Sequence, residues 1–320
     1  MEYKILTESE FKNLNIKFKK GIYSEEYFDF VKNYYSADLY FLVFEEKGEL
    51  FGILPLSSYK QNNVLVLGTL PKTDALIEFK KVFDVDYPLV IKVLKKHFPD
   101  HQSVDFRIFS YSGKSPMKEL KKLPIYHAVA EIKNEDFLSF FDKKTRNQTR
   151  QSLNSNFEVK TNFPIESVYE LYLENMKRHG TPPKKLDYFQ SLKENLKEKV
   201  FFLGAFQGEK LCGVNIFYIN NDYLLLINNL SLREYWPERV NNFLYFKTIE
   251  YGYKKGVRHF DYGPSTQKDF SHLDFKIGFG GKPWGVYEYN WYRNPLIKLV
   301  NYIKNKGRNI KMRIKKFLFK

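Results

Sequence analysis

Two stretches of this 320-residue chain repeat one order of apolar runs and turns, and this order constrains the fold most. Residues 39–70 and residues 200–230 each contain three apolar runs, separated first by a glycine turn and then by a polar break. Short apolar runs joined by tight glycine turns predict a meander of three antiparallel strands. The two meanders lie about 160 residues apart, which indicates two related domains and excludes a short-period repeat.

Helical patterns accompany both meanders in a similar order. Residues 23–35 precede the first meander, and residues 165–180 and 186–199 precede the second. After the second meander, six residues spaced at i, i+3, i+4, i+7, i+8 and i+11 form one face of a predicted helix. A helix stop follows at Gly256. The members of that face are Val240, Phe243, Leu244, Lys247, Thr248 and Tyr251. Residues 257–263 then read as a short strand, and the aromatic run 284–292 reads as the final strand of the second domain.

Composition favours packed cores in a reducing compartment. Apolar residues make up 43% of the chain and aromatic residues 18%, which argues against disorder. The single cysteine, Cys212, lies in a strand-like run, so it forms no intrachain disulfide and reads as a buried thiol. The six histidines form no metal-ligand spacing, and we therefore expect no metal site.

The charge of the chain is concentrated at its C-terminal end. The formal net charge is +15, and residues 289–320 contain basic residues but no Asp or Glu. Residues 293–320 interleave these cations with Leu, Ile, Val and Phe, as basic amphipathic helices at anionic membrane surfaces do. Binding to RNA and a solvated tail are the alternatives. Because we find neither a signal peptide nor an apolar run long enough to span a membrane, we expect a cytoplasmic protein.

Three segments together resemble a known family. They are "KKTRNQTRQS" (143–152), "RHGTPPKKLDYFQSL" (178–192) and "FDYGPSTQ…LDFKIGFGG" (260–281). Their order and spacing resemble the FemABX peptidoglycan bridge aminoacyltransferases and the FemAB-like, BioF2-like proteins associated with cell-surface polysaccharide genes. The order of helices and strands is that of the GNAT acyltransferase fold. The resemblance covers residues 135–292, and over the first domain it is architectural.

The resemblance implies a fold and a domain division. The expected fold class is α/β (α+β), with two tandem GNAT-like domains, each a mixed central sheet flanked by helices, and a basic amphipathic helix at the C-terminus. We expect domains at residues 1–134 and 135–292, followed by a tail at 293–320. The long helical hairpin that some FemABX members insert in the second domain has no counterpart, because too few residues lie between 192 and 200.

The resemblance also implies an activity. FemABX enzymes transfer an amino acid from aminoacyl-tRNA to an amine of a lipid-linked or nucleotide-linked cell-envelope precursor, whose diphosphate is held by Lys and Arg side chains. No cofactor is bound permanently, and the precursor, tRNA and the inner face of the membrane are the expected partners. The first alternative is an N-acyltransferase that uses acyl-CoA or an acyl-carrier thioester on a cell-surface sugar amine. The second alternative is a non-enzymatic RNA- or membrane-binding protein on a GNAT scaffold.

The usual acetyl-CoA loop of GNAT enzymes is absent from the sequence. That loop places glycines at a helix N-terminus so that the backbone N–H groups reach the pyrophosphate. At the corresponding place there is no glycine between Asn228 and Phe246, and the first domain offers only Gly68 before its turn. This absence weighs against an ordinary acetyltransferase and agrees with the FemABX resemblance.

Candidate substrate-binding residues lie in three places before residue 260. Arg146 and Arg150 are four apart, so they share a helix face suited to phosphate unless that face is merely solvated. The segment "RHGTPP" places His179 and Thr181 beside the expected acceptor pocket, although Gly and Pro there are also ordinary helix punctuation. A third pair, Asn228 and Asn229, interrupts an apolar run and needs hydrogen-bond partners, either a substrate amide or the neighbouring protein.

The segment 260–281 carries the proposed catalytic residues. We expect a strand that ends near Asp261 and then a polar loop containing Asp269, His272 and Asp274. Asp261 is predicted to orient an attacking amine, and Lys276 to neutralise phosphate or a developing oxyanion. The substrate-binding candidates in this segment are Gly263, Ser265, Thr266 and Gly278. The implied chemistry is aminolysis of an ester or thioester, in which proximity and oxyanion stabilisation supply most of the catalysis.

Overall fold

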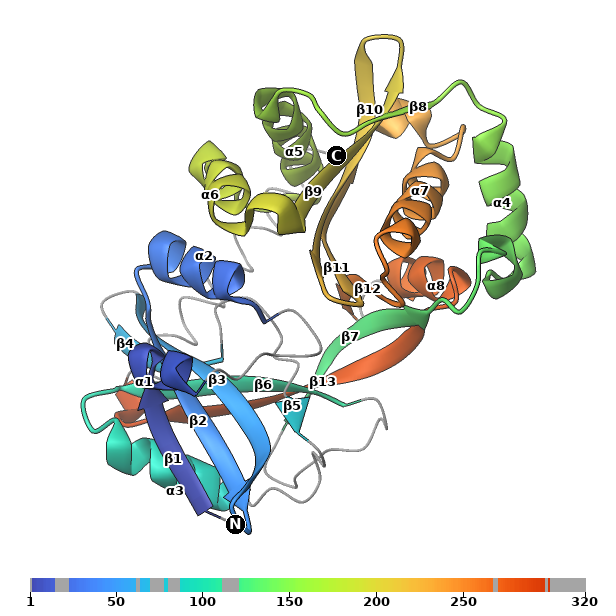
Figure 1. Ribbon diagram of the computed structural model, residues 1–320. Helices are drawn as coiled ribbons and strands as arrows, with labels where there is room; N and C mark the ends of the chain where they lie inside the picture. The colour runs from blue at the N-terminus through green and yellow to red at the C-terminus, as the bar shows by residue number, and fades with distance from the viewer. Residues whose placement is uncertain are drawn as a thin grey trace. The chain divides into compact units, whose positions relative to one another are not determined.

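The computed structural model describes residues 2–14, 23–61, 64–69, 78–79, 87–110, 121–266, 270–296 and 299 (Figure 1). The chain divides into two compact units. Unit 1 comprises Met1–Ile125 and Trp284–Gly307, and unit 2 comprises Tyr126–Pro283 and Arg308–Lys320. Each unit has its own mixed sheet and its own hydrophobic core.

Unit 1 is built on a sheet in the order β1-β2-β3-β4-β6-β13, with β5 paired to β3. The strands are β1 (Glu2–Thr7), β2 (Asp38–Glu46), β3 (Glu49–Gln61), β4 (Val64–Gly68), β5 (Glu78–Phe79), β6 (Ser103–Ser110) and β13 (Lys282–Tyr292). The helices are α1 (Glu8–Asn13), α2 (Glu25–Tyr35) and α3 (Tyr87–His97). The pairing of β4 with β6 is parallel, whereas β1–β2, β2–β3, β3–β4 and β6–β13 are antiparallel.

Alternate residues of β2 pack on opposite faces of this sheet. Leu42 belongs to a core cluster with Val90 and Leu94 of α3. Its neighbour Phe41 stacks on Phe11 of α1, with 3.9 Å between the ring centroids, and meets Phe28 of α2 edge-on. The near-continuous apolar run of β2 therefore reflects burial on both faces.

Unit 2 is built on a sheet in the order β7-β12-β11-β10-β9-β8. The strands are β7 (Lys121–Glu131), β8 (Glu158–Lys160), β9 (Val200–Gln207), β10 (Lys210–Asn220), β11 (Tyr223–Ser231) and β12 (His259–Thr266). The helices are α4 (Lys143–Leu153), α5 (Ile165–His179), α6 (Leu186–Leu196), α7 (Val240–Lys254) and α8 (Phe270–Gly278). Three short 3₁₀ helices are η2 (Phe137–Phe140), η3 (Lys197–Lys199) and η4 (Arg233–Tyr235).

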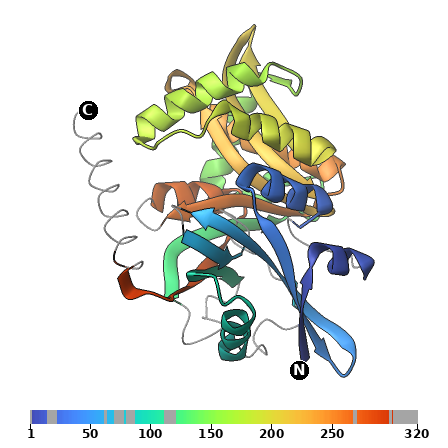
Figure 2. The same ribbon diagram turned by 90° about the vertical axis from the view of Figure 1, so that its left-hand side faces the viewer.

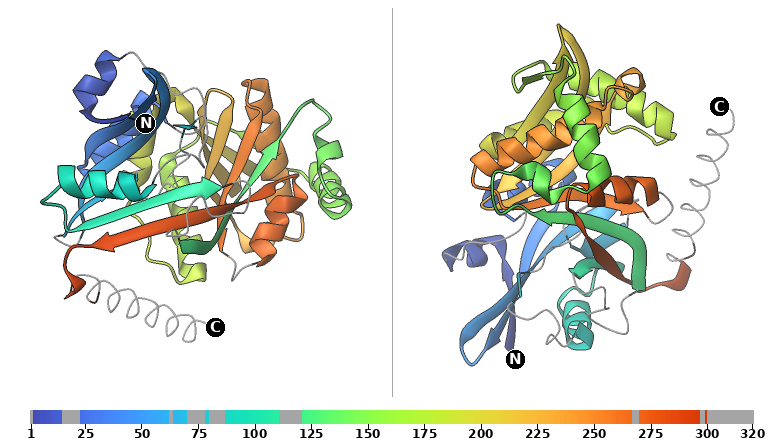
Figure 3. Two further views of the ribbon diagram at one scale, coloured as in Figure 1. Left: turned by 90° about the horizontal axis from the view of Figure 1, so that it is seen from below. Right: turned by 90° about the vertical axis from the view of Figure 1, so that its right-hand side faces the viewer.

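Helices cover both faces of the unit 2 sheet. Helices α5 and α6 lie in front of the strands in Figure 2, and α4 and α7 lie in front of them from the opposite side in the right-hand view of Figure 3. Helix α7 approaches the sheet closely at Gly252, where an added Cβ would lie 2.8 Å from the ring of Phe260. Phe217, Leu244 and Ile249 are fully buried in the core between α7 and the sheet.

The structure confirms both predicted meanders. Strands β2, β3 and β4 pair antiparallel in sequence order, and so do β9, β10 and β11. The first turn of each meander contains a glycine with positive φ, 78° at Gly48 and 59° at Gly208. The predicted helices at 23–35, 143–152, 165–180, 186–199 and 240–251 correspond to α2, α4, α5, α6 with η3, and α7.

The aromatic strand 284–292 belongs to a different sheet from the one that the sequence predicts. It forms β13, which pairs with β6 of unit 1 in a register that sets Val286 opposite Phe109. Tyr287 is 1% exposed and belongs to the core cluster of unit 1. The compact units divide the chain after Ile125 and after Pro283, whereas the sequence predicts boundaries after residues 134 and 292. For strand 284–292 the reason is that a strand pattern does not specify the sheet that the strand completes.

Two expectations concern membranes. The predicted basic amphipathic helix at 293–320 lies outside the described residues, apart from 293–296 and 299. Among the helices that the structure describes, none is long and apolar enough to cross a membrane.

A buried histidine makes the stability of unit 1 depend on pH. His101 is 7% exposed, its Nε2 lies 2.8 Å from Ser58 Oγ, and its Nδ1 is buried without a partner. Burial lowers the pKa of His101 below its ordinary value of 6.5, against the opposing charges of Asp100 and Asp38. The unfolded chain therefore binds a proton that the folded chain does not, and stability falls as pH drops below about 6.5.

We predict that His101→Gln weakens this acid-induced loss of stability. Urea denaturation of both proteins between pH 8 and pH 5 measures the effect, because other titrating groups cancel in the difference. A difference in unfolding free energy that stays constant over that range contradicts the prediction.

Candidate active site at the end of β12

Strands β11 and β12 pair over only part of their length. Their parallel register joins Tyr223, Leu224 and Leu225 to His259, Phe260 and Asp261. Strand β11 then continues to Ser231 and β12 to Thr266, and the register of β11 with β10 shifts between Ile216 and Phe217. Ligand sites form preferentially where neighbouring strands diverge, so the end of β12 is a favourable place for one.

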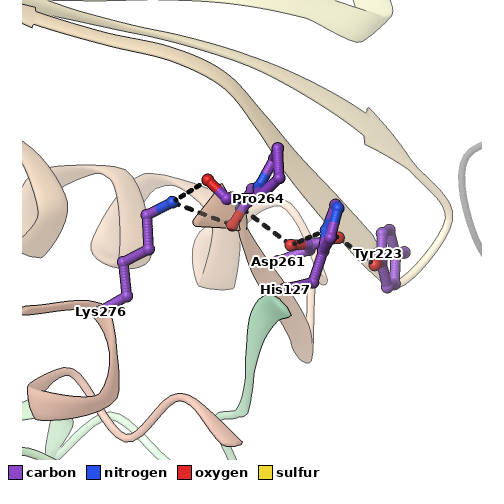
Figure 4. A network of polar contacts seen from close by, with 6 residues as sticks. His127, Tyr223, Asp261, Pro264 and Lys276 are labelled. Carbon is purple, nitrogen blue, oxygen red and sulfur yellow. Dashed lines mark hydrogen bonds and ion pairs between the residues drawn. The ribbon is translucent and has the colours of Figure 1, made fainter. Parts of the chain in front are cut away.

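Asp261 is the centre of a buried polar network (Figure 4). The residue is 1% exposed, and its carboxylate accepts hydrogen bonds from Tyr223 Oη (2.8 Å) and from the backbone N–H of Gly263 (2.8 Å). His127 Nδ1 on β7 lies 2.9 and 2.8 Å from the two carboxylate oxygens. Burial raises the pKa of Asp261, but attraction to His127 and these hydrogen bonds hold it below its ordinary value. Asp261 is therefore a carboxylate in the folded protein.

Lys276 reaches the same strand end from α8. Its ammonium nitrogen donates hydrogen bonds to the carbonyl oxygens of Gly263 and Pro264, each at 2.9 Å (Figure 4). The residue is 8% exposed, and burial lowers its pKa to about 8, against the attraction of Asp261. An ammonium carries three N–H donors, so one remains after the two carbonyls are satisfied. Near neutral pH this group can neutralise an anion, and a small rise in pH releases its proton.

Ser265 and Gly263 complete the strand end. Ser265 is 4% exposed, and its Oγ is buried without a hydrogen-bond partner. A buried hydroxyl with no partner is costly, so Ser265 is a candidate donor to a bound group. Gly263 has φ of +74°, and an added Cβ would lie 2.7 Å from the carbonyl oxygen of Leu226. Thr266 is the last residue of β12.

The prediction of a polar loop after β12 is wrong over residues 270–278, because these residues form helix α8. Leu273 and Lys276, three apart, are buried on one face of the helix, whereas His272 and Asp274 are exposed. The helical period was obscured because a lysine occupies a buried position. Asp269 lies outside the described residues.

Gly278 permits a close approach between α8 and α4. An added Cβ there would meet Oγ1 of Thr145, and the carbonyl of Gly278 accepts the N–H of Asp142 at 2.9 Å. Glycine is therefore required at position 278 because α4 packs against it.

A pocket of about 470 Å³ opens at the N-terminal ends of α4, α7 and α8. Its walls include Lys144 of α4, Trp236, Arg239 and Asn242 beside or in α7, and Asp274 of α8. Helix α7 has no side-chain cap and no acid in its first turn, so its N-terminus is free to attract an anion. Nδ2 of Asn242, which is 3% exposed, is buried without a partner. The pocket therefore combines an aromatic ring, two cations, two carboxylates (Asp142 and Asp274), an open helix end and an unpaired amide.

The remaining predicted site residues lie elsewhere in unit 2. On α4, Arg146 is half-buried and Arg150 exposed, while Thr145 and Thr149 form the buried face. His179 and Thr181 are exposed at the C-terminal end of α5, on either side of Gly180, whose φ is 63°.

The two asparagines of β11 have different surroundings. Asn229 Nδ2 donates to Asn215 Oδ1 at 2.7 Å, and Asn215 Nδ2 donates to Thr248 Oγ1 at 2.9 Å. The partner of Asn229 is thus a neighbouring side chain. Asn228 is half-buried, and no side-chain hydrogen bond of it is found within the described parts of the chain.

Sequence reasoning missed several residues of these sites, among them His127, Tyr223, Trp236 and Asn242. His127 lies in a strand 134 residues before Asp261 in the sequence, so no local spacing relates the two. A polar residue within an apolar strand was the available signal for His127. Trp236 comes directly after the 3₁₀ helix η4 and is 39% exposed, although its side chain is large and apolar.

The chain is similar in sequence to one protein family and in fold to several solved structures. Residues 133–276 match the family model described as an acetyltransferase (GNAT) domain. Among solved structures, FemX covers 94% of this chain and 100% of its own, with 12% identity and a TM-score of 0.67. A tandem GNAT protein from the clavulanic acid biosynthesis pathway covers 90% and 98%, with 11% identity and a TM-score of 0.54. L-PGS from Bacillus licheniformis covers 86% and 89%, with 14% identity and a TM-score of 0.52. No curated protein matches the sequence.

These findings show a tandem GNAT fold in which residues 133–276 match an acetyltransferase domain, and they support an acyltransferase. Within this class it resembles the FemABX-like tandem GNAT transferases, which confirms the resemblance seen in the sequence. The predicted fold class of two tandem GNAT-like domains is confirmed as well.

We predict that Gly263→Ala destabilises the protein by about 1–3 kcal/mol, because alanine combines backbone strain with a clash against Leu226. Gly256→Ala is the matched control, since its φ is +90° but nothing lies within 4 Å of an added Cβ. Thermal unfolding measures both variants. Equal losses would show that the close approach to Leu226 contributes nothing.

We predict that Lys276 makes stability rise with pH above about 8. The folded-state pKa is lowered from 10.5 to about 8, so the unfolded chain binds more protons between these values. The wild type should therefore gain about 3 kcal/mol relative to Lys276→Met between pH 7.5 and pH 10.5. Guanidinium denaturation across that range measures the gain, and parallel pH profiles of the two proteins contradict it.

Proposed function

We propose that the protein transfers an amino acid from aminoacyl-tRNA to an amine of a lipid-linked or nucleotide-linked cell-envelope precursor. The observation that carries this proposal is the pocket at the α7 N-terminus. Trp236 offers an aromatic ring there, with the guanidiniums of Arg178 and Arg233 at 4.9 and 5.9 Å from the ring centroid. Lys144 and Arg239 offer two cations, alongside the carboxylates of Asp142 and Asp274. An aromatic ring with cations around it suits a nucleotide. The positive φ of Arg239, 63°, falls at the helix N-cap, where the acetyl-CoA loop would supply glycine. An RNA end that relies on side chains thus fits better than a pyrophosphate that relies on close backbone contact.

The end of β12 supplies groups for the transfer step. The acceptor amine attacks the carbonyl carbon of the aminoacyl ester and forms the new C–N bond, the C–O bond to the ribose breaks, and the proton that the amine loses is taken up by the ribose oxygen. The Lys276 ammonium and the Ser265 hydroxyl are suited to stabilise the tetrahedral oxyanion. A direct contact between Asp261 and the acceptor amine would displace one of the hydrogen-bond donors that Asp261 now has. Asp261 is therefore assigned to hold the strand end that Lys276 binds.

The acceptor is expected to carry phosphate. Arg146 and Arg150 on α4 suit the diphosphate of a cell-envelope precursor, and His179 and Thr181 remain candidates for contacts with the acceptor. A lipid-linked acceptor would place the enzyme at the inner face of the cell membrane, where the basic segment 293–320 would be attracted to anionic headgroups.

Acyl-CoA is the competing donor. The match of residues 133–276 to an acetyltransferase domain favours it, because that family is described by acetyl transfer. An acyl-CoA donor would imply a sugar amine or a similar small amine as acceptor.

A donor screen separates the two functions. Purified protein is incubated with mixed charged tRNAs carrying labelled amino acids, or with labelled acetyl-CoA, and with lipid-linked and nucleotide-linked precursors. We expect label to pass from tRNA to the precursor. Transfer from acetyl-CoA combined with none from any charged tRNA would overturn the proposal.

Trp236→Leu should raise KM for aminoacyl-tRNA about tenfold, since stacking on an aromatic ring contributes about 1–3 kcal/mol per base. Trp236→Phe is the matched control, because it keeps a ring while also losing the hydrogen bond from Nε1 to Ser231. Equal values of KM for the two variants would contradict stacking at Trp236.

A further inference from the structure

His127 and Tyr223 lie outside the residues that bind substrate in the proposed function, yet both contact Asp261. His127 comes from β7 and is 4% exposed, and Tyr223 begins β11 and is 5% exposed. An ionised carboxylate only accepts hydrogen bonds, so the Nδ1 atom of His127 must carry the hydrogen that points to Asp261.

These two side chains make a buried charge tolerable. A carboxylate removed from water is costly unless it is paired and hydrogen-bonded. Asp261 has three such donors: the ring of His127, the hydroxyl of Tyr223 and the backbone N–H of Gly263. Loss of either side-chain donor leaves the carboxylate with fewer partners and strains the remaining contacts.

The third donor links Asp261 to Lys276. The N–H of Gly263 is bound to Asp261 Oδ1, while the carbonyl of the same residue accepts a hydrogen bond from Lys276. Lys276 binds the carbonyl of Pro264 as well, so its ammonium is held by two consecutive residues of β12. Gly263 has a positive φ. Asp261 therefore fixes its backbone through the N–H, and Lys276 fixes it through the carbonyls of Gly263 and Pro264.

We infer that His127 and Tyr223 are positioning residues that hold the Lys276 ammonium through Asp261 and the carbonyls of Gly263 and Pro264. The consequence for catalysis rests on the proposed function. Withdrawal of either donor should loosen the strand end and misplace the ammonium relative to the reacting carbonyl. The place of Lys276 itself can be measured without any substrate.

Acetylation of Lys276 by acetic anhydride, followed by peptide mass spectrometry, reports how firmly its amine is held. We expect Tyr223→Phe and His127→Leu to raise the rate of modification at Lys276 about tenfold, because each removes one hydrogen bond to a buried charge. His127→Gln keeps an N–H donor and should restore a rate near that of the wild type. Tyr172→Phe is the matched control, since it removes a buried hydroxyl that accepts the N–H of Lys184 on another part of unit 2.

A second measurement follows the protonation of Lys276 by NMR of ¹³Cε-labelled lysine, with the resonance identified by its loss in Lys276→Arg. Asp261→Asn should lower the midpoint from about 8, because the carboxylate favours the charged amine. An unchanged midpoint, or rates in Tyr223→Phe and His127→Leu equal to that of Tyr172→Phe, overturns the inference. If His127→Leu fails to fold, Tyr223→Phe decides the question.

Kinetics then distinguish this inference from the proposed function. With an active donor, Tyr223→Phe should lower kcat about tenfold to a hundredfold while KM for the acceptor stays unchanged. Should no donor support transfer while acetylation of Lys276 responds as expected, the proposed function fails and the positioning role stands. Should transfer proceed normally in Tyr223→Phe, the positioning role fails and the proposed function stands.

Discussion

The buried carboxylate of Asp261 is the interaction on which the candidate site depends. One residue in β12 connects β7 through His127, β11 through Tyr223 and its own strand end through Gly263. A charge with 1% exposure is costly unless it is paired and hydrogen-bonded, and these donors supply both. The same requirement makes the local structure specific, because few arrangements of three strands satisfy one carboxylate so fully.

Helix α8 extends this arrangement toward a binding pocket. Lys276 on one side of the helix holds the end of β12, while Ser271, Asp274 and Phe275 line the pocket at the α7 N-terminus. Gly278 brings the end of α8 against α4, whose Lys144 lies in the same pocket. A single short helix thus connects the group suited to stabilise an oxyanion with the walls suited to bind a donor.

Much of the fold could be predicted from the sequence, and less of the site. The meanders follow from apolar runs and glycine turns, and α7 follows from its helical spacing, since these signals are local. The predicted catalytic residues Asp261 and Lys276 do come together at one strand end. Their partners His127 and Tyr223 were not predicted, because contacts across 134 and 38 residues leave no local pattern.

By itself, the sequence determined the two-domain repeat, the types of most elements and the absence of a glycine cradle before α7. These features depend on neighbouring residues and on backbone preferences that act over a few positions. Only the tertiary structure decided that 284–292 completes the sheet of unit 1, that 270–278 is a helix and that Asp261 has three donors. Each of these outcomes depends on which distant strand or helix satisfies a buried group, and hydrogen-bond satisfaction in a core is a property of the whole packed unit.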